Sequence, residues 1–189
     1  SDVTAILLAI YAKTGHTTYY GPALVASFGE FAPFVDQSYQ SFSDLLIEPK
    51  PLPYLYERPF QWTDEFIDWE TQHRPKKGKD NQVKYLGKGQ INGRVIGGNL
   101  NTMSAFWGSP YMPTIQAGDI LLIEDSLKDI ATVERLLAML KLNQVFDRIA
   151  ALIVGKHEGL KDLKTSRNTL DVLREVLNGQ ILPIVYDFD

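Results

Sequence analysis

The sequence contains no cysteine, so no disulfide can form. A chain without disulfides suits a reducing compartment, although many exported bacterial proteins also lack them. No apolar run approaches the roughly 18 to 20 residues that a membrane-spanning helix needs, and no signal peptide begins the chain. We therefore expect a soluble, cytoplasmic protein with no membrane partner.

Basic residues are outnumbered by acidic ones. The chain has 19 lysines and arginines against 23 aspartates and glutamates, which gives a net charge of −4 and an isoelectric point near 5.4. A general nucleic-acid or anionic-membrane binder needs a basic face. Neither partner is expected here.

Several common catalytic and cofactor motifs are missing. There is no Walker-type phosphate loop, no dinucleotide-binding glycine motif and no G-x-S-x-G. His16, His73 and His157 lack the spacing of zinc ligands, so neither a metal nor a cofactor is predicted. His157 follows an expected strand and could be catalytic on position alone, but a solvated loop histidine is the favoured interpretation.

The 189 residues are 44% hydrophobic and 22% charged, which is ordinary for a globular protein that buries a real core. The chain opens with an expected helix that carries one apolar face and stops at Gly15. A short strand is predicted at 17–20. The apolar positions of the helix are Val3, Ile6, Leu7, Ile10 and Tyr11. The next expected helix carries Tyr39, Phe42, Leu45 and Leu46.

The segment 48–90 differs in composition, because it is rich in proline, which favours an ordered but irregular arm. Trp62 and Trp69 lie seven residues apart with Phe66 between them. Two interpretations stay open: a local aromatic cluster that holds the loop down, or a platform for a flat ligand group. The basic run at 76–79 is interpreted as a solvated loop tip.

Strands and helices alternate from residue 120 to residue 186. Ser126 and Asp129 are predicted to cap a helix whose inner face holds Leu127, Ile130, Val133, Leu137 and Leu140. Strands are expected at 120–123, 149–154 and 181–186, and a second helix ends at Gly179. This order predicts right-handed βαβ crossovers and an α/β fold with a partly parallel sheet.

The central stretch, Arg94 to Asp125, carries the proposed chemistry. It contains an expected Gly-Gly-Asn turn at 97–99, a small-residue loop at 108–110 and an apolar strand that ends in Glu124 and Asp125. Open α/β sheets place their sites at the carboxyl ends of strands. Glu124 is therefore a candidate functional carboxylate, although the first acidic residue after a strand is more often a solvated loop residue.

Three stretches together resemble the LD-carboxypeptidase family of serine peptidases, and most closely its microcin C immunity branch. They are Ser1-Asp2 opening an apolar helix, GGNLNTMSAFWGSPYMP at 97–113 and GDILLIED at 118–125. The resemblance implies that Ser1 is the nucleophile of a Gly-x-Ser-Asp elbow and that Glu124 is the triad carboxylate. It places the catalytic histidine just beyond Asp189.

Further roles follow from the resemblance. The backbone N–H of Asp2 would supply half of an oxyanion hole. Asn99, Asn101 and Lys128 match positions near the polar and carboxylate groups of the substrate, and Trp62 and Trp69 fall where the immunity branch stacks its nucleotide. The substrate is then a small peptide or an aminoacyl-nucleotide, and a homodimer is expected.

The resemblance also implies a domain organisation. Residues 1–47 would be a remnant of the nucleophile domain, 48–90 a linker arm and 91–189 a swivelling-type β/α domain with the triad glutamate. We expect the chain to be part of a longer protein and inactive alone. Three hypotheses stay open: hydrolysis of an aminoacyl-nucleotide amide, cleavage of a murein tetrapeptide, and ligand binding without catalysis. An autoprocessed N-terminal nucleophile hydrolase is disfavoured, because those enzymes begin with a strand.

Overall fold

The computed structural model describes residues 2–189, so Ser1 lies outside the described residues. The chain divides into two compact units. The larger combines the residues up to Tyr20 with Val83–Phe188, and the smaller holds Gly21–Gln82 and Asp189. The boundaries predicted at 47/48 and 90/91 refer to the domains of a longer protein and stay a prediction.

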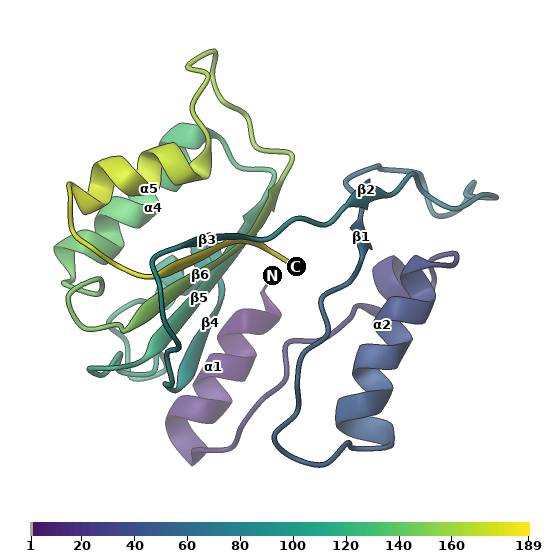
Figure 1. The fold of residues 1–189 in the computed structure, drawn as a ribbon, viewed down its shortest axis with the longest axis horizontal. Helices are drawn as coiled ribbons and strands as arrows, with labels where there is room; N and C mark the ends of the chain where they lie inside the picture. The colour runs from purple at the N-terminus through teal and green to yellow at the C-terminus, as the bar shows by residue number, and fades with distance from the viewer. Residues whose placement is uncertain (1) are drawn as a thin grey trace. The chain divides into compact units, whose positions relative to one another are not determined.

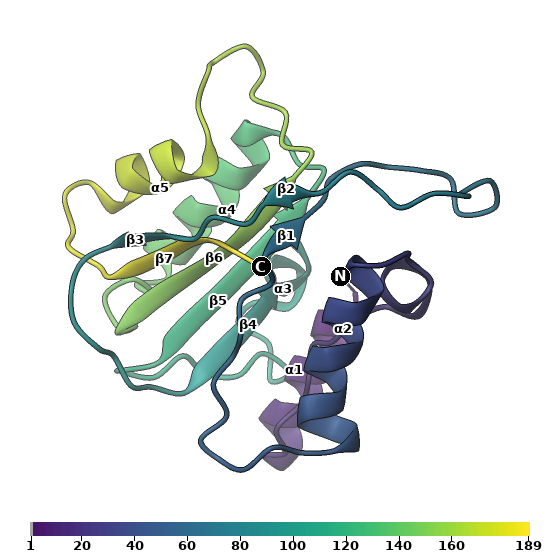
Figure 2. The ribbon, with the colours of Figure 1, turned by 45° about the vertical axis from the view of Figure 1, so that its right-hand side comes forward.

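The larger unit is built on a five-stranded sheet with the order β3-β7-β6-β5-β4 (Figure 2). The strands are β3 Lys84–Leu86, β4 Val95–Asn99, β5 Ile120–Ser126, β6 Ala151–Glu158 and β7 Ile184–Phe188. Strands β4 to β7 are parallel, and β3 pairs antiparallel with β7 at one edge. The predicted α/β fold with a largely parallel sheet is confirmed.

Four helices pack on this sheet. They are α1 Val3–Thr14, α3 Leu100–Phe106, α4 Ile130–Leu142 and α5 Thr169–Leu177. Helices α4 and α5 lie on one side of the sheet and α1 on the other (Figure 1). The core is formed by aliphatic side chains that β5 and β6 share with α4 and α5. Its fully buried members include Leu121, Ile123, Leu137, Leu140, Leu152 and Leu173.

The start of α4 differs from the prediction. Ser126 belongs to β5, and Leu127 is 69% exposed with a positive φ of 57°. Asp129 alone caps the helix, because its side chain accepts a hydrogen bond from the Thr132 N–H at 2.7 Å. The expected inner face from Ile130 onward is correct.

Helix α1 has the predicted bounds, since Gly15 ends it in the left-handed conformation. Its predicted inner face is only partly correct: Leu7 and Tyr11 are half-buried, and Tyr11 packs against the core. Val3, Ile6 and Ile10 are 50%, 61% and 42% exposed, whereas Thr4 and Leu8 are buried. The turn of the helix that can approach β4 closely carries a small side chain, and this selects Thr4 over its larger apolar neighbours.

The segment 17–20 has no regular secondary structure, although a short strand was predicted there. No strand pairs with it; instead the Thr18 hydroxyl donates to the Leu7 carbonyl at 3.3 Å and ties the segment back to α1. A β propensity without a neighbouring strand edge does not produce a strand.

The Gly-Gly pair was predicted to form a turn, but both glycines lie inside β4. A Cβ on Gly97 would sit 1.9 Å from the Leu122 carbonyl oxygen, and one on Gly98 would sit 2.7 Å from Thr4. Gly98 also has a φ of 148°. The two glycines therefore let β5 and α1 approach β4 closely.

The part of the smaller unit from residue 48 onward is mostly irregular, as its proline content predicted. It holds the π-helical turns η1 Leu24–Phe28 and η2 Ser43–Ile47, helix α2 Phe34–Phe42, and the two-residue strands β1 Gln61–Trp62 and β2 Lys79–Asp80. The basic run is not a free loop tip. The Lys76 side chain is only 12% exposed and pairs with Glu30 at 2.8 Å.

Candidate active site

The carboxyl ends of β4 and β5 bring Asn99 and Glu124 side by side, because these residues are register partners in the parallel pair. The next strand, β6, continues the same edge with Gly155 and His157. A register shift interrupts the β5–β6 pairing between Ile123 and Asp125. Such irregularities re-aim side chains next to functional sites. This edge is the candidate active site.

Glu124 is held from two directions. The Tyr20 hydroxyl, 3.2 Å away, donates a hydrogen bond to its Oε1. Burial, together with the neighbouring Glu124 carboxylate, raises the pKa of Tyr20, so the hydroxyl keeps its proton at neutral pH. On the other side, Gly155 leaves the space that the Glu124 side chain fills, since a Cβ there would lie 2.8 Å from the Cβ of Glu124.

The first turn of α1 lies next to this edge. The Asn99 N–H donates to the Thr4 hydroxyl at 3.0 Å, and Thr4 is 1% exposed. Asp2 stands at the N-cap position of α1 and is exposed, and its carbonyl accepts the Ala5 N–H. The start of α1 is thus fixed one strand away from Glu124, although about 120 residues separate them in the sequence.

Asp125 points to the opposite face of β5 from Glu124, as successive strand residues do. Its carboxylate is 1% exposed and accepts three hydrogen bonds. The donors are the Asn99 side-chain amide at 3.3 Å, the Asn101 N–H at 3.2 Å and the Ser126 N–H at 3.0 Å. Asn99 also caps α3 by accepting from the Thr102 N–H and hydroxyl. Asn99 is therefore engaged in holding the fold together.

Lys128 lies in the loop after β5, with its Nζ 3.8 Å from the Asp125 carboxylate and its side chain 31% exposed. The loop is anchored to the chain that follows β6. The Leu127 N–H donates to the Glu158 carbonyl at 2.7 Å, and the Lys128 carbonyl accepts from the Lys161 N–H at 3.0 Å. The ammonium group is thus partly exposed at the same edge as Asn101.

His157 is not the solvated loop residue that the sequence suggested, because β6 extends through it. Burial lowers its pKa, although the carboxylates of Asp125, Glu124 and Asp187 act in the opposite direction. Its Nδ1 lies 3.3 Å from the Gly155 carbonyl, and its buried Nε2 has no hydrogen-bond partner among residues 2–189. The side chain is therefore neutral at pH 7.

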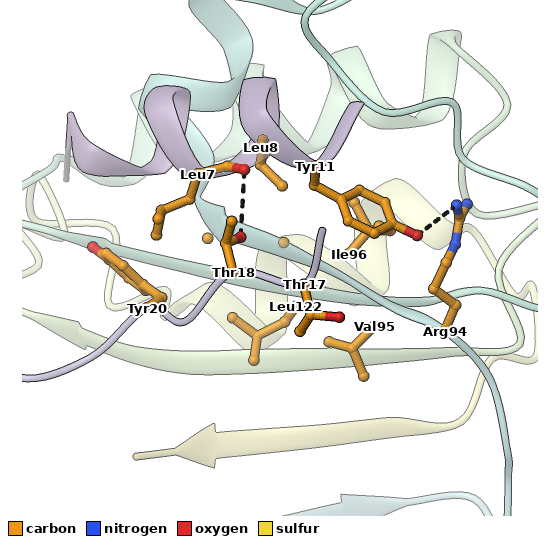
Figure 3. A pocket seen from close by; sticks show the side chains of 12 residues that line it. Leu7, Leu8, Tyr11, Thr17, Thr18, Tyr20, Arg94, Val95, Ile96 and Leu122 are labelled. Carbon is orange, nitrogen blue, oxygen red and sulfur yellow. Dashed lines mark hydrogen bonds between the residues drawn. The ribbon is translucent and has the colours of Figure 1, made fainter. Parts of the chain in front are cut away.

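A cavity of about 470 Å³ lies between α1, the segment 17–20 and β4 (Figure 3). Its walls are largely apolar, from Leu7, Leu8, Ile96 and Leu122. Arg94 is at its rim, but its guanidinium is engaged by the Asp119 carboxylate, by the Tyr11 hydroxyl and by the Thr114 carbonyl. Arg94 is thus not available to bind an anion there.

Trp62 and Trp69, the two tryptophans predicted to bind substrate, belong to the smaller unit. Lys79 Nζ lies 5.2 Å from the centre of the Trp62 ring. Trp69 is 55% exposed and Phe66 is 84% exposed. These exposures contradict the interpretation that the three rings pack as one local cluster. A role as a ligand platform stays a prediction.

Sequence reasoning missed four residues that shape this site: Thr4, Tyr20, Asp125 and Gly155. No local pattern identifies a threonine on a helix or a tyrosine in a loop as a neighbour of Glu124. The position of Asp125 at the end of an apolar strand was a signal that could have been used. An acidic residue there is either exposed or surrounded by hydrogen-bond donors, because a buried carboxylate needs them. Within residues 2–189, no group of three metal-ligating side chains is found and no helix is long and apolar enough to cross a membrane.

Comparison with known families gives the same assignment. The model of the LD-carboxypeptidase C-terminal domain matches residues 92–189, which is more than half of the chain. The chain belongs to the LD-carboxypeptidase family. The resemblance drawn from the motifs is therefore confirmed.

Three relatives illustrate the range of the family. A Vibrio cholerae protein with a provisional carboxypeptidase name is 56% identical over 189 residues. The microcin C7 self-immunity protein MccF of Escherichia coli is 51% identical over 191 residues. A Bacillus subtilis protein with a provisional name as a murein peptide carboxypeptidase is 24% identical over 184 residues. The chain is fully covered by the first two matches but spans only 56% of the length of either relative.

The solved structures agree. MccF in complex with glutamyl sulfamoyl guanosine has a TM-score of 0.94 and 51% identity; the match covers 100% of this chain and 57% of that one. A complex of MccF with aspartyl sulfamoyl adenosine matches equally well. The fold of this chain is that of the corresponding part of MccF.

Proposed function

We propose that the LD-carboxypeptidase-like protein containing this chain is a serine hydrolase that cleaves an amide bond in an aminoacyl- or peptidyl-nucleotide. The observation that carries the proposal is the Thr4–Asn99 hydrogen bond, which fixes the start of α1 one strand away from Glu124. This contact supports the proposal because it holds the first turn of α1, which follows Asp2, at the same edge of the sheet as the Glu124 carboxylate.

In the proposed chemistry, the Ser1 hydroxyl attacks the amide carbonyl carbon while a histidine from outside this sequence accepts its proton. Glu124 orients that imidazole and stabilises its charged form. The backbone N–H of Asp2 donates to the developing oxyanion. The C–N bond then breaks and the amine leaves with the proton from the imidazolium. Water finally hydrolyses the ester on Ser1 and regenerates the hydroxyl.

The substrate class rests on the relatives. MccF is 51% identical to this chain and has been solved with acidic aminoacyl sulfamoyl nucleosides. In this chain, Asn101 and Lys128 lie at one edge of the sheet, where an amide and an ammonium group suit the polar and carboxylate groups of such a ligand. Stacking of the nucleoside on Trp62 or Trp69, a homodimeric state and a cytoplasmic location remain predictions.

The test uses the full-length protein with aspartyl sulfamoyl adenosine and a murein tetrapeptide as separate substrates, followed by chromatography and mass spectrometry. We expect cleavage of the nucleoside, and Ser1→Ala should reduce it by at least about 10³-fold, because a triad acts as a unit and losing its nucleophile costs about as much as losing all three members. Cleavage of the tetrapeptide alone would favour the murein peptidase alternative. Tight calorimetric binding without turnover of either compound would favour the non-catalytic module, and undiminished turnover by Ser1→Ala would refute the nucleophile.

A further inference from the structure

Asp125 is a buried carboxylate that the proposed chemistry does not use. At 1% exposure, its charge is removed from water almost completely. Burying a carboxylate without partners is very costly, so such groups are retained only where donors surround them. The three donors of Asp125 come from Asn99, Asn101 and Ser126, on the ends of β4 and β5 and the start of α3.

These donors link the end of β4 to the end of β5, the strand that carries Glu124. The Asn99 amide and the Asn101 N–H belong to the turn from β4 into α3, and Ser126 closes β5. One carboxylate therefore sets the position of the β4–α3 turn relative to β5. The backbone of Asn101, a half-buried residue at this turn, is held by the same carboxylate.

Lys128 is the cationic neighbour of Asp125, with its Nζ 3.8 Å from the carboxylate. A free lysine side chain samples many rotamers, and ordering it on binding a ligand costs about tenfold in affinity. Asp125 is almost fully buried, whereas the Lys128 side chain that pairs with it is 31% exposed and can still be reached by a ligand. The Asp125–Lys128 pair has no net charge. It therefore attracts an incoming anion through the oriented ammonium donor of Lys128 and not through excess positive charge.

We propose that Asp125 is a positioning residue, which preorganises Lys128 and the Asn101 turn to receive the acidic side chain or carboxylate of the substrate. This inference rests on the proposed function, because it takes Lys128 and Asn101 as the groups that meet the ligand. It assigns discrimination between acidic and neutral aminoacyl groups to a residue that does not touch either.

The experiment measures binding by calorimetry, so that it does not depend on turnover. Full-length protein carrying Ser1→Ala is titrated with aspartyl sulfamoyl adenosine and with its alanyl counterpart. Adding Asp125→Asn should weaken binding of the aspartyl compound about tenfold, the cost of reordering the lysine, and change binding of the alanyl compound less than threefold. Lys128→Met should do the same, and the double variant should lose little more than either single variant.

Lys88→Gln is the matched control, because Lys88 is an exposed lysine in the loop between β3 and β4. It should leave both affinities unchanged. Equal losses for the two compounds, additive effects in the double variant, or tighter binding of the aspartyl compound by Asp125→Asn would each overturn the positioning role. Tighter binding would mean that relief of the negative charge outweighs lost orientation.

Thermal melting shows whether Asp125→Asn folds. Should it not fold, Lys128→Met decides alone: retained preference for the aspartyl compound overturns the proposal, and loss of that preference supports it. Failure of the proposed hydrolase function and failure of the positioning role of Asp125 give different results. Binding with the expected discrimination but no hydrolysis by the unmodified protein would refute the hydrolase while supporting the role of Asp125. Hydrolysis by the unmodified protein, together with discrimination that Asp125→Asn leaves unchanged, would support the hydrolase and refute the role of Asp125.

Discussion

Replacing Gly155 by alanine tests whether Glu124 is placed by the close packing of β5 on β6. The added Cβ would lie 2.8 Å from the Glu124 Cβ and 3.5 Å from its Cα. Carbon atoms pack at about 3.5 to 4.0 Å, so one strand must yield by about 1 Å. The obstacle is the base of a side chain and not its flexible end, and the Glu124 carboxylate has to move with it.

Two magnitudes follow. Overpacking of this kind costs about 1 to 3 kcal/mol of unfolding free energy. A displacement of about 1 Å in a catalytic group costs about 100-fold in rate. We therefore expect Gly155→Ala to lower kcat/KM of the full-length protein about 100-fold, mainly through kcat, because in the proposed chemistry Glu124 acts on the histidine and not on the bound substrate.

The assay pairs urea denaturation with steady-state cleavage of aspartyl sulfamoyl adenosine. Gly21→Ala is the matched control, since nothing lies within 4 Å of a Cβ there and its φ is not positive; it should change neither quantity appreciably. A Gly155→Ala protein that loses stability but keeps kcat/KM within threefold of the unmodified protein would show that the strands yield elsewhere. That result would refute the placement of Glu124 by Gly155.

Three further predictions concern the contacts around the site. Thr4→Val should cost about 1 to 3 kcal/mol by urea denaturation, because it leaves the buried Asn99 N–H without an acceptor, whereas Thr4→Ser should cost much less; equal losses would contradict this. Arg94→Met should cost about 3 to 5 kcal/mol, because the Asp119 side chain, 5% exposed, loses its partner; adding Asp119→Asn should recover part of the loss, and no recovery would count against a charge effect. Burial lowers the pKa of His157 below its ordinary 6.5, so the unfolded chain binds that proton more readily and stability should fall as the pH drops from 6.5 toward the folded pKa; an NMR titration giving a pKa above 6.5 would contradict this.

Local patterns in the sequence were sufficient for most of the larger unit. The apolar spacing of α4 and α5, the stop at Gly15 and the alternation of strands with helices all predict elements that the structure contains. They are predictable because a helix or a central parallel strand buries a face that its own residues define. The family assignment also came from contiguous motifs around Glu124.

Contacts between distant segments could not be predicted in this way. The Gly97–Gly98 pair was predicted to form a turn because its close contacts with Leu122 and Thr4 are not visible in the local sequence. For the same reason the burial of Thr4 on the inner face of α1 was not predicted. His157 reads as a loop residue because nothing local shows that β6 continues past Val154.

The sequence was enough to determine the fold class and the family, because both depend on residues close together in the chain, and it singled out the acidic end of the central strand as a candidate site. Only the tertiary structure showed that Thr4, Tyr20, Asp125 and Gly155 surround or support that end. Their roles depend on hydrogen bonds and close packing between segments up to 104 residues apart. They also depend on whether a polar side chain is buried, and neither property leaves a periodic pattern in the sequence.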